Sequence, residues 1–308
     1  MGLAAVGPNS GPGRERATTG VAARIETAVA RLASTVVLWL AAMMAPASAE
    51  VPRRIVSLDL CTDQLLIELA PPERIAAVTH LAADASVSAI PDRARGIHVT
   101  HGAAEDVLGL DPDLVLAGPF GVSPTVDLLR RLKRNVVVVP LAQDLDGVRL
   151  SIRTVATAIG EAARGAAMIE AFDRRLASLT RPRHGPPPTA VIYQVGGVTS
   201  RPGSLADAAL SAAGFHNRAG DYRLSRSGQI PLELLVAAPP DLIVLASAAN
   251  AYRTAAADNL RHPVLNQLRA GHAFLELRWQ LWLCGTPHIA DAIDQLVAAR
   301  QRLQAARP

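Results

Sequence analysis

Two stretches of the chain, 128 positions apart, follow one pattern, and this duplication limits the folds open to it. Residues 105–117 read E-D-V-L-G-L-D-P-D-L-V-L-A, and residues 233–245 read E-L-L-V-A-A-P-P-D-L-I-V-L. In both, a glutamate opens a short apolar helical turn, a Pro-Asp pair ends it, and a run of apolar residues follows. Proline cannot continue a helix, and apolar runs without alternation are typical of strands buried in parallel sheets. The duplication predicts two α/β lobes of one design. The alternative is that a helix, a Pro-Asp pair and a strand follow one another by chance, because this order is common in α/β proteins.

The first 49 residues have the organisation of a secretory signal. Four arginines precede an apolar run at 32–45, and Ala47-Ser48-Ala49 then supplies small residues at a cleavage site. The alternative is a membrane anchor, but the run is shorter than the roughly 20 apolar residues that a span needs. We therefore predict a signal peptide over 1–49, cleaved near Ala49, and export to the periplasm.

Composition narrows the class of the remaining chain. Of the 308 residues, 50% are hydrophobic, which is sufficient for two cores. Residues 50–308 keep 27 basic and 25 acidic side chains, a balance too even to predict nucleic-acid binding. We expect an exported globular protein that works as a monomer.

Apolar patterning places the elements of two lobes and a connecting helix. Apolar residues recur three or four positions apart over 145–179, which predicts one long helix of roughly 50 Å, longer than one lobe is wide. The predicted organisation is an N-terminal lobe over 50–143, a bridging helix over 144–182 and a C-terminal lobe over 183–308. In the first lobe we predict a helix over 63–69 and strands at 55–58, 75–79, 97–99, 114–117 and 136–139. In the second we predict helices at 204–213 and 287–303 and strands at 190–195, 242–246 and 273–277.

The order of these parts resembles a known family, the substrate-binding proteins of ABC importers for iron–siderophore complexes, haem or cobalamin. The resemblance rests on R-I-V-S-L-D-L-C-T-D-Q-L-L at 54–66, the paired Glu and Pro-Asp-Leu units, the long bridging helix, and W-L-C-G-T-P at 282–287. It covers residues 52–308. It implies an α/β fold of two Rossmann-like lobes bridged by one long α-helix, with a metal chelate held between the lobes and little hinge movement. It also implies an ABC permease in the inner membrane as partner, and neither catalysis nor a cofactor.

Candidate ligand-binding residues follow from the same fold. In open α/β sheets, ligands bind beyond the carboxyl ends of the strands, so the loops directly after the strands are the ones to consider. Arginine pairs with anionic oxygens, and indole supplies a flat apolar wall for a macrocycle, which suits a large, partly anionic chelate. Simpler alternatives are packing for the tryptophans and solvation for the arginines. The candidates are Asp59, Cys61, Thr62, His80, His101, Phe120, Arg201, Arg253, Trp279, Trp282 and Cys284.

The two cysteines, Cys61 and Cys284, have three interpretations: a disulfide beside the cleft, two buried free thiols, or a soft-metal or thiol-reactive site. An oxidising compartment permits the disulfide, but a Cα separation below about 7 Å is required. A bare metal site is disfavoured, because His98 and His101 lie on a strand and its following loop, and no helical histidine pair is present.

Glu105 and Glu233 are expected to contact the permease. In the family that this chain resembles, one exposed glutamate on each lobe engages permease arginines, and these two residues match that pattern. The alternative is local, because a carboxylate in the first turn of a helix interacts favourably with free N–H groups.

Two other classes of function remain open. One is a periplasmic enzyme or metal-handling protein that uses Cys61, Cys284 and nearby histidines, although no catalytic motif is present in the chain. The other is a sensory or scaffold protein that keeps the fold without transport.

Overall fold

The computed structural model describes residues 50–119, 123–180, 185–222, 224, 228–246, 260 and 262–306. The predicted signal peptide lies outside these residues. Val51–Pro308 forms one compact unit, separate from residues 1–50, and all that follows concerns this unit. Within the described part of the chain, no helix combines the length and apolar character needed to cross a membrane.

The first lobe is built on a five-stranded sheet in which all neighbouring strands are parallel. The strand order is β3-β2-β1-β4-β5, so the chain reverses its direction across the sheet between β1 and β4. The predicted strands are confirmed with small differences at their ends, except the one predicted at 97–99, which shares only Val99 with β3. The bounds are β1 Ile55–Ser57, β2 Ile75–Thr79, β3 Val99–Thr100, β4 Leu114–Ala117 and β5 Val136–Val138.

The second lobe repeats this arrangement with four parallel strands in the order β7-β6-β8-β9. The chain reverses its direction across this sheet between β6 and β8, at the place that corresponds to β1 and β4 in the first lobe. The first sheet differs by one additional strand, β3, at its edge. The two duplicated sequence units end in β4 and β8, so the prediction of two lobes of one design is confirmed. The bounds are β6 Thr189–Tyr193, β7 His216–Asn217, β8 Leu242–Ala246 and β9 Ala273–Leu277.

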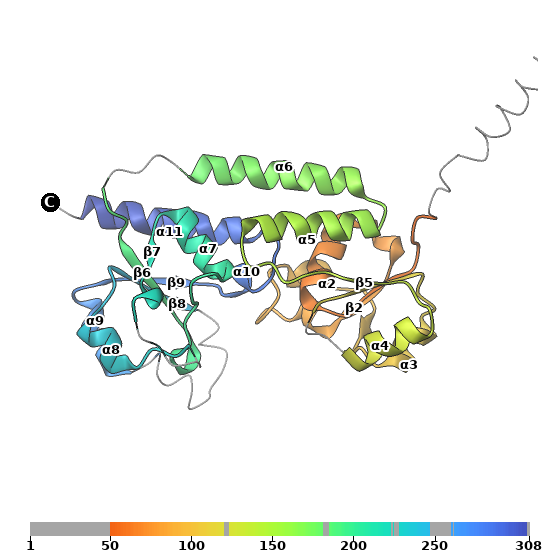
Figure 1. Cartoon of the computed structure of the whole chain (residues 1–308), viewed down its shortest axis with the longest axis horizontal. Coiled ribbons are helices and arrows are strands. Elements are labelled where there is room, and N and C mark those ends of the chain that lie inside the picture. Colours follow the sequence, from red (N-terminus) through yellow and green to blue (C-terminus); the bar gives the residue numbers. More distant parts are fainter. Residues whose placement is uncertain are drawn as a thin grey trace, which may run out of the picture. The chain divides into compact units, whose positions relative to one another are not determined.

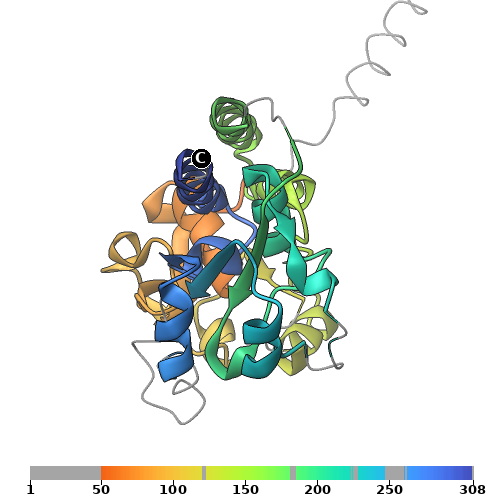
Figure 2. The same cartoon turned by 90° about the vertical axis from the view of Figure 1, so that its left-hand side faces the viewer.

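Helices cover both faces of each sheet (Figures 1 and 2). One face of each sheet contributes to a single apolar core that runs through both lobes. That core also takes side chains from α2 Leu60–Leu69, α5 Leu145–Ala158, α6 Ala162–Leu179, α7 Leu205–Ala213, α10 Gln280–Leu283 and α11 Ile289–Ala305. The opposite faces pack separately, the first against α3 Ala104–Gly109 and α4 Ser123–Arg131, the second against α8 Leu232–Ala237 and α9 Pro263–Arg269. Short 3-10 turns lie at Pro72–Arg74, His80–Ala83, Pro91–Ala94, Val195–Gly197 and Arg218–Gly220.

The single long helix predicted over 145–179 is wrong, because the structure divides it into α5 and α6. The chain turns at Gly160, whose φ of 74° is left-handed and ends α5. The two helices then run back along each other (Figure 1), and Gly165 allows an approach so close that an added Cβ would lie 2.3 Å from the Cβ of Ala156. Both helices bury a face in the same core, which is why the apolar spacing continues across the break.

Helix α6 is the element that joins the lobes. Arg149 of α5 and Arg175 of α6 make ion pairs of 2.7 Å to Asp173 and 2.6 Å to Asp291 of α11. The charged face of α6 is thereby attached to a helix of each lobe. These pairs are partly exposed, so they position α6 more than they stabilise it.

Candidate functional site

The first sheet's chain reversal places two loops at the carboxyl ends of β1 and β4, where open α/β sheets bind ligands. Asp59 follows β1, and Gly118 follows β4. The backbone of Gly118 lies against the Asp59 carboxylate so closely that a Cβ at position 118 would be 2.5 Å from the nearest carboxylate atoms. A side chain at position 118 would therefore displace the Asp59 carboxylate from its present place.

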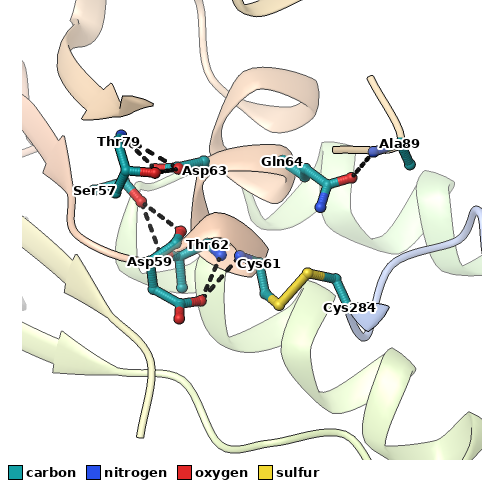
Figure 3. The surroundings of a disulfide bond; sticks show 9 residues. All are labelled: Ser57, Asp59, Cys61, Thr62, Asp63, Gln64, Thr79, Ala89 and Cys284. Atoms are coloured by element: carbon teal, nitrogen blue, oxygen red, sulfur yellow. Dashed lines mark hydrogen bonds between the residues drawn. A yellow bond between two sulfur atoms is a disulfide. The ribbon is translucent and has the colours of Figure 1, made fainter. Parts of the chain in front are cut away.

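Asp59 caps the first helix of the lobe. Its Oδ1 accepts hydrogen bonds from the N–H groups of Cys61 at 2.9 Å and Thr62 at 3.4 Å (Figure 3). Thr62 is buried, and its Oγ1 shares a hydrogen bond of 2.7 Å with the hydroxyl of Ser57. This cap starts α2 at Leu60. The predicted start of the helix, at residue 63, was therefore three residues too late. Cys61 and Thr62 are thus held on a helix.

Cys61 and Cys284 form a disulfide with a Cα separation of 5.0 Å, across 223 positions of sequence (Figure 3). Of the three interpretations of the cysteines, the disulfide is confirmed. Cys61 lies in the first turn of α2, and Cys284 caps the end of α10. The bond therefore links the first helix of the N-terminal lobe to the segment that follows the last strand of the C-terminal lobe.

A cavity of about 370 Å³ lies beside the disulfide. Its walls come from the loops after β1, β4 and β5, from α2 and α5, and from the residues on either side of Cys284. Most of the lining is apolar, with Asp59, Thr62 and Ser151 as polar exceptions. The lining residues are Asp59, Leu60, Cys61, Thr62, Leu65, Pro119, Val139, Pro140, Leu141, Ala142, Ser151, Leu283 and Gly285.

Further contacts attach the segment after β9 to the N-terminal lobe. The indole N–H of Trp279 donates to the carbonyl of Ser86 at 2.9 Å, and the Gln280 amide donates to the carbonyl of Ala85 at 2.8 Å. His288 shares a hydrogen bond of 3.0 Å with Glu68, which raises the pKa of His288 above its ordinary value. With the disulfide, these bonds hold the segment that contains Leu283 and Gly285, which line the cavity, against the N-terminal lobe.

Asp63 lies one turn beyond Asp59 and is completely buried. Its carboxylate accepts the N–H of Thr79 at 3.2 Å and the Thr79 hydroxyl at 2.5 Å, which joins α2 to the end of β2 (Figure 3). Burial raises the pKa of Asp63 to about 7, against hydrogen bonds from Ser57 and Thr79 that lower it; the charge of Asp59 adds to the rise. The carboxyl group therefore takes up its proton near neutral pH.

We expect Asp63→Asn to remove a pH dependence from the stability of the fold. Because the pKa is higher in the folded state, Asp63 contributes stability fully below about pH 4 and loses it as the pH rises through about 7. The asparagine side chain does not titrate. Chemical denaturation of both proteins from pH 4 to 8 should show the wild type losing stability relative to the variant over this range. A difference independent of pH would contradict the burial of an ionisable Asp63.

The structure separates the other predicted ligand residues. His80 and His101 follow neighbouring strands and are both exposed, with ring centroids 4.9 Å apart, but they do not line the cavity. Arg201 is exposed and also lies outside the lining. Trp279 is half-buried, and Trp282 keeps 7% of its surface exposed within the shared core, which favours packing as its role. Phe120 and Arg253 lie outside the described residues.

Glu105 and Glu233 occupy matching positions. Each is the second residue of a six-residue helix, α3 or α8, and each is exposed. Neither carboxylate makes a hydrogen bond or ion pair with another described residue. Neither accepts a hydrogen bond from the N–H groups of its own helix, but both lie in the first turn, so their positions fit the local charge–dipole interpretation as well as docking.

Sequence reasoning missed several features of the site. Gly118 and Ser151 gave no signal, because their roles depend on approach across the fold. Asp63 gave a weak signal, because an aspartate inside an otherwise apolar helix has to be either exposed or bound to a hydrogen-bond or charge partner. Across the described chain, no three His, Cys, Asp or Glu side chains gather into a group that could hold a metal ion.

Comparisons with known proteins agree with this architecture. Two curated relatives, cobalamin-binding proteins from two strains of Halobacterium salinarum, are 30% identical over 210 residues, which is 65% of this chain and 55% of theirs. The chain thus spans about half the length of these relatives.

Solved structures match over most of the chain. The apo periplasmic heme-binding protein RhuT from Roseiflexus sp. RS-1 aligns with a TM-score of 0.65 and 21% identity, over 82% of this chain and 98% of that one. The periplasmic vitamin B12 binding protein BtuF of Vibrio cholerae aligns with a TM-score of 0.64 and 19% identity, with the same coverage. These identities show a shared fold. The family model described as periplasmic binding protein matches residues 55–273, and the chain belongs to the periplasmic binding protein family.

Proposed function

We propose that this protein is an exported receptor that binds a metal-containing macrocycle between its lobes and delivers it to an ABC importer. Cobalamin is the first candidate ligand, because the curated relatives are cobalamin-binding proteins; haem and ferric siderophores follow. The observation that carries the proposal is the cavity at the carboxyl ends of β1, β4 and β5, closed on one side by residues of the C-terminal lobe. Export with cleavage near Ala49 belongs to the same proposal, and N-terminal sequencing of the exported protein tests it.

The lining of the cavity suits a mostly apolar part of a ligand. Ligand sites are concave, largely apolar, and about 300–1,000 Å³ in volume, with a few polar groups that fix orientation. A cavity of about 370 Å³ is at the small end of that range. We therefore infer that it takes one edge of the macrocycle, and that the remainder extends toward the loops after β2 and β3, where His80 and His101 are exposed.

The disulfide and the hydrogen bonds of Trp279 and Gln280 connect the two lobes. A site that is already formed loses less conformational entropy when its ligand binds. We infer that the receptor recognises its ligand with little movement between the lobes. Glu105 and Glu233, exposed on matching helices, would then contact arginines of the permease.

Binding of the macrocycle can be tested by titration. The purified protein is titrated with cyanocobalamin, hemin and a ferric siderophore, and binding is followed by the visible absorption of the ligand and by tryptophan fluorescence. We expect one macrocycle to bind tightly, and Leu141→Asp to weaken it about tenfold or more, because Leu141 lines the cavity and the new carboxylate would be desolvated there.

Leu150→Asp is the matched control. Leu141 and Leu150 are both 47% exposed, but Leu150 does not line the cavity. The control should bind like the wild type. If none of the three ligands binds, the proposed ligand class is wrong, and if Leu141→Asp binds normally, the ligand does not use this cavity.

A further inference from the structure

A second hollow, of about 440 Å³, lies between α8 and α9 on the C-terminal lobe. We call it the α8–α9 notch. It shares no lining residue with the cavity beside the disulfide. Its lining is Leu232, Glu233, Val236, Ala237, His262 and Val264. Val236 is 41% exposed, whereas the other face of its helix packs into the core.

The rim of the notch carries groups that recognise a peptide. Glu233 lies three residues before Val236, so the carboxylate and the exposed valine share one face of α8. Across the notch, Nδ1 of His262 accepts the N–H of Val264 at 3.3 Å, which places the ring proton on Nε2. His262 is exposed, so this N–H can donate to a partner. The notch thus combines a carboxylate acceptor, an apolar floor and an imidazole N–H donor.

We propose that the α8–α9 notch receives an apolar side chain of the importer's membrane subunit, from a loop that also presents an arginine or lysine to Glu233. This inference rests on the proposed function and extends it from one ion pair to a surface. Charge complementarity selects the occupant, because Glu233 has no ion-pair partner among the described residues. The backbone carbonyl of the inserted residue would accept the Nε2–H of His262.

The two lobes differ at this point. On the N-terminal lobe, α4 beside Glu105 ends in Arg130 and Arg131, and Leu128 is 39% exposed. On the C-terminal lobe, the equivalent place beside Glu233 is the largely apolar notch. Two matching glutamates with different surroundings would allow the importer to distinguish one lobe from the other.

Val236→Asp tests the notch directly. A carboxylate on the apolar floor would be desolvated and would lie beside Glu233, so we expect uptake of labelled cyanocobalamin by cells to fall about tenfold or more. Affinity of the purified variant for cyanocobalamin should stay within twofold of wild type. Leu150→Asp, also an exposed helical residue, should leave both measurements unchanged. Normal uptake by Val236→Asp would overturn the proposal.

Cross-linking identifies the occupant. The sequence contains two cysteines, and both are in the disulfide, so Val236→Cys introduces a single free thiol for a benzophenone maleimide. Irradiation with native membranes should join position 236 to the importer's membrane subunit, at a segment with an arginine or lysine close to an apolar residue. An adduct mainly to a second copy of this chain, or an equal yield from Leu150→Cys, would overturn the proposal.

The proposal for the notch and the proposed receptor function are contradicted by different experimental outcomes. If Val236→Asp transports normally while Glu105→Ala with Glu233→Ala does not, the notch is not a contact and the receptor function stands. If the wild-type protein binds none of the macrocycles and its deletion leaves uptake unchanged, the receptor function itself is wrong.

Discussion

Replacing Glu105 and Glu233 together with alanine is expected to abolish uptake of the ligand while leaving its binding intact. The carboxylates are exposed on matching helices outside the cavity and have no partner among the described residues. One charge-assisted hydrogen bond contributes about 1.5–3 kcal/mol, so losing one at each lobe should weaken docking by roughly a hundredfold or more. Uptake of labelled cyanocobalamin, ligand titration and thermal unfolding of the same variant measure the three effects separately.

A matched double variant provides the control. Glu73 and Asp106 are also exposed acidic residues in the first turns of short helices, so Glu73→Ala with Asp106→Ala removes the same charge from other positions. This variant should transport normally. If the Glu105 and Glu233 variant also transports normally, the glutamates serve only their own helices and the docking proposal is wrong.

Removing the disulfide is expected to cause the largest loss of stability. Cys61 and Cys284 are 223 positions apart, so the bond restricts almost the whole unfolded chain. In the chain-entropy account a loop of this length corresponds to about 5 kcal/mol of unfolding free energy. Cys61→Ala with Cys284→Ala should therefore unfold roughly 10 °C below the wild type. Ligand affinity should fall too, because Leu283 and Gly285 beside Cys284 form a wall of the cavity.

Reducing the disulfide of the wild-type protein distinguishes the stability lost with the bond from any stability lost through changed packing of the alanine side chains. Dithiothreitol should lower the melting temperature of the wild type toward that of the double variant and leave the variant unaffected. A double variant that melts with the wild type would show that the shared core and the hydrogen bonds of Trp279, Gln280 and His288 hold the lobes together without the bond.

The sequence by itself determined the lobes, most strands and the matching glutamates. Apolar runs and Pro-Asp breaks act within a few residues, so the strands at 114–117 and 242–246 and the helices before them could be located from local pattern. The duplication then implied equivalent places for Glu105 and Glu233, which the two sheets bear out. Docking at those places stays a prediction.

Only the tertiary structure decided where the helix over 145–179 breaks and how the site closes. Apolar spacing is the same for one long helix and for two that bury a face in one core, so the turn at Gly160 was hidden by the pattern. The Cys61–Cys284 bond, the burial of Trp282, the contact of Gly118 with Asp59 and the raised pKa of Asp63 all depend on groups brought together from distant segments. Local sequence records which chemical groups a chain carries, whereas burial and partnership are set by packing across the whole fold.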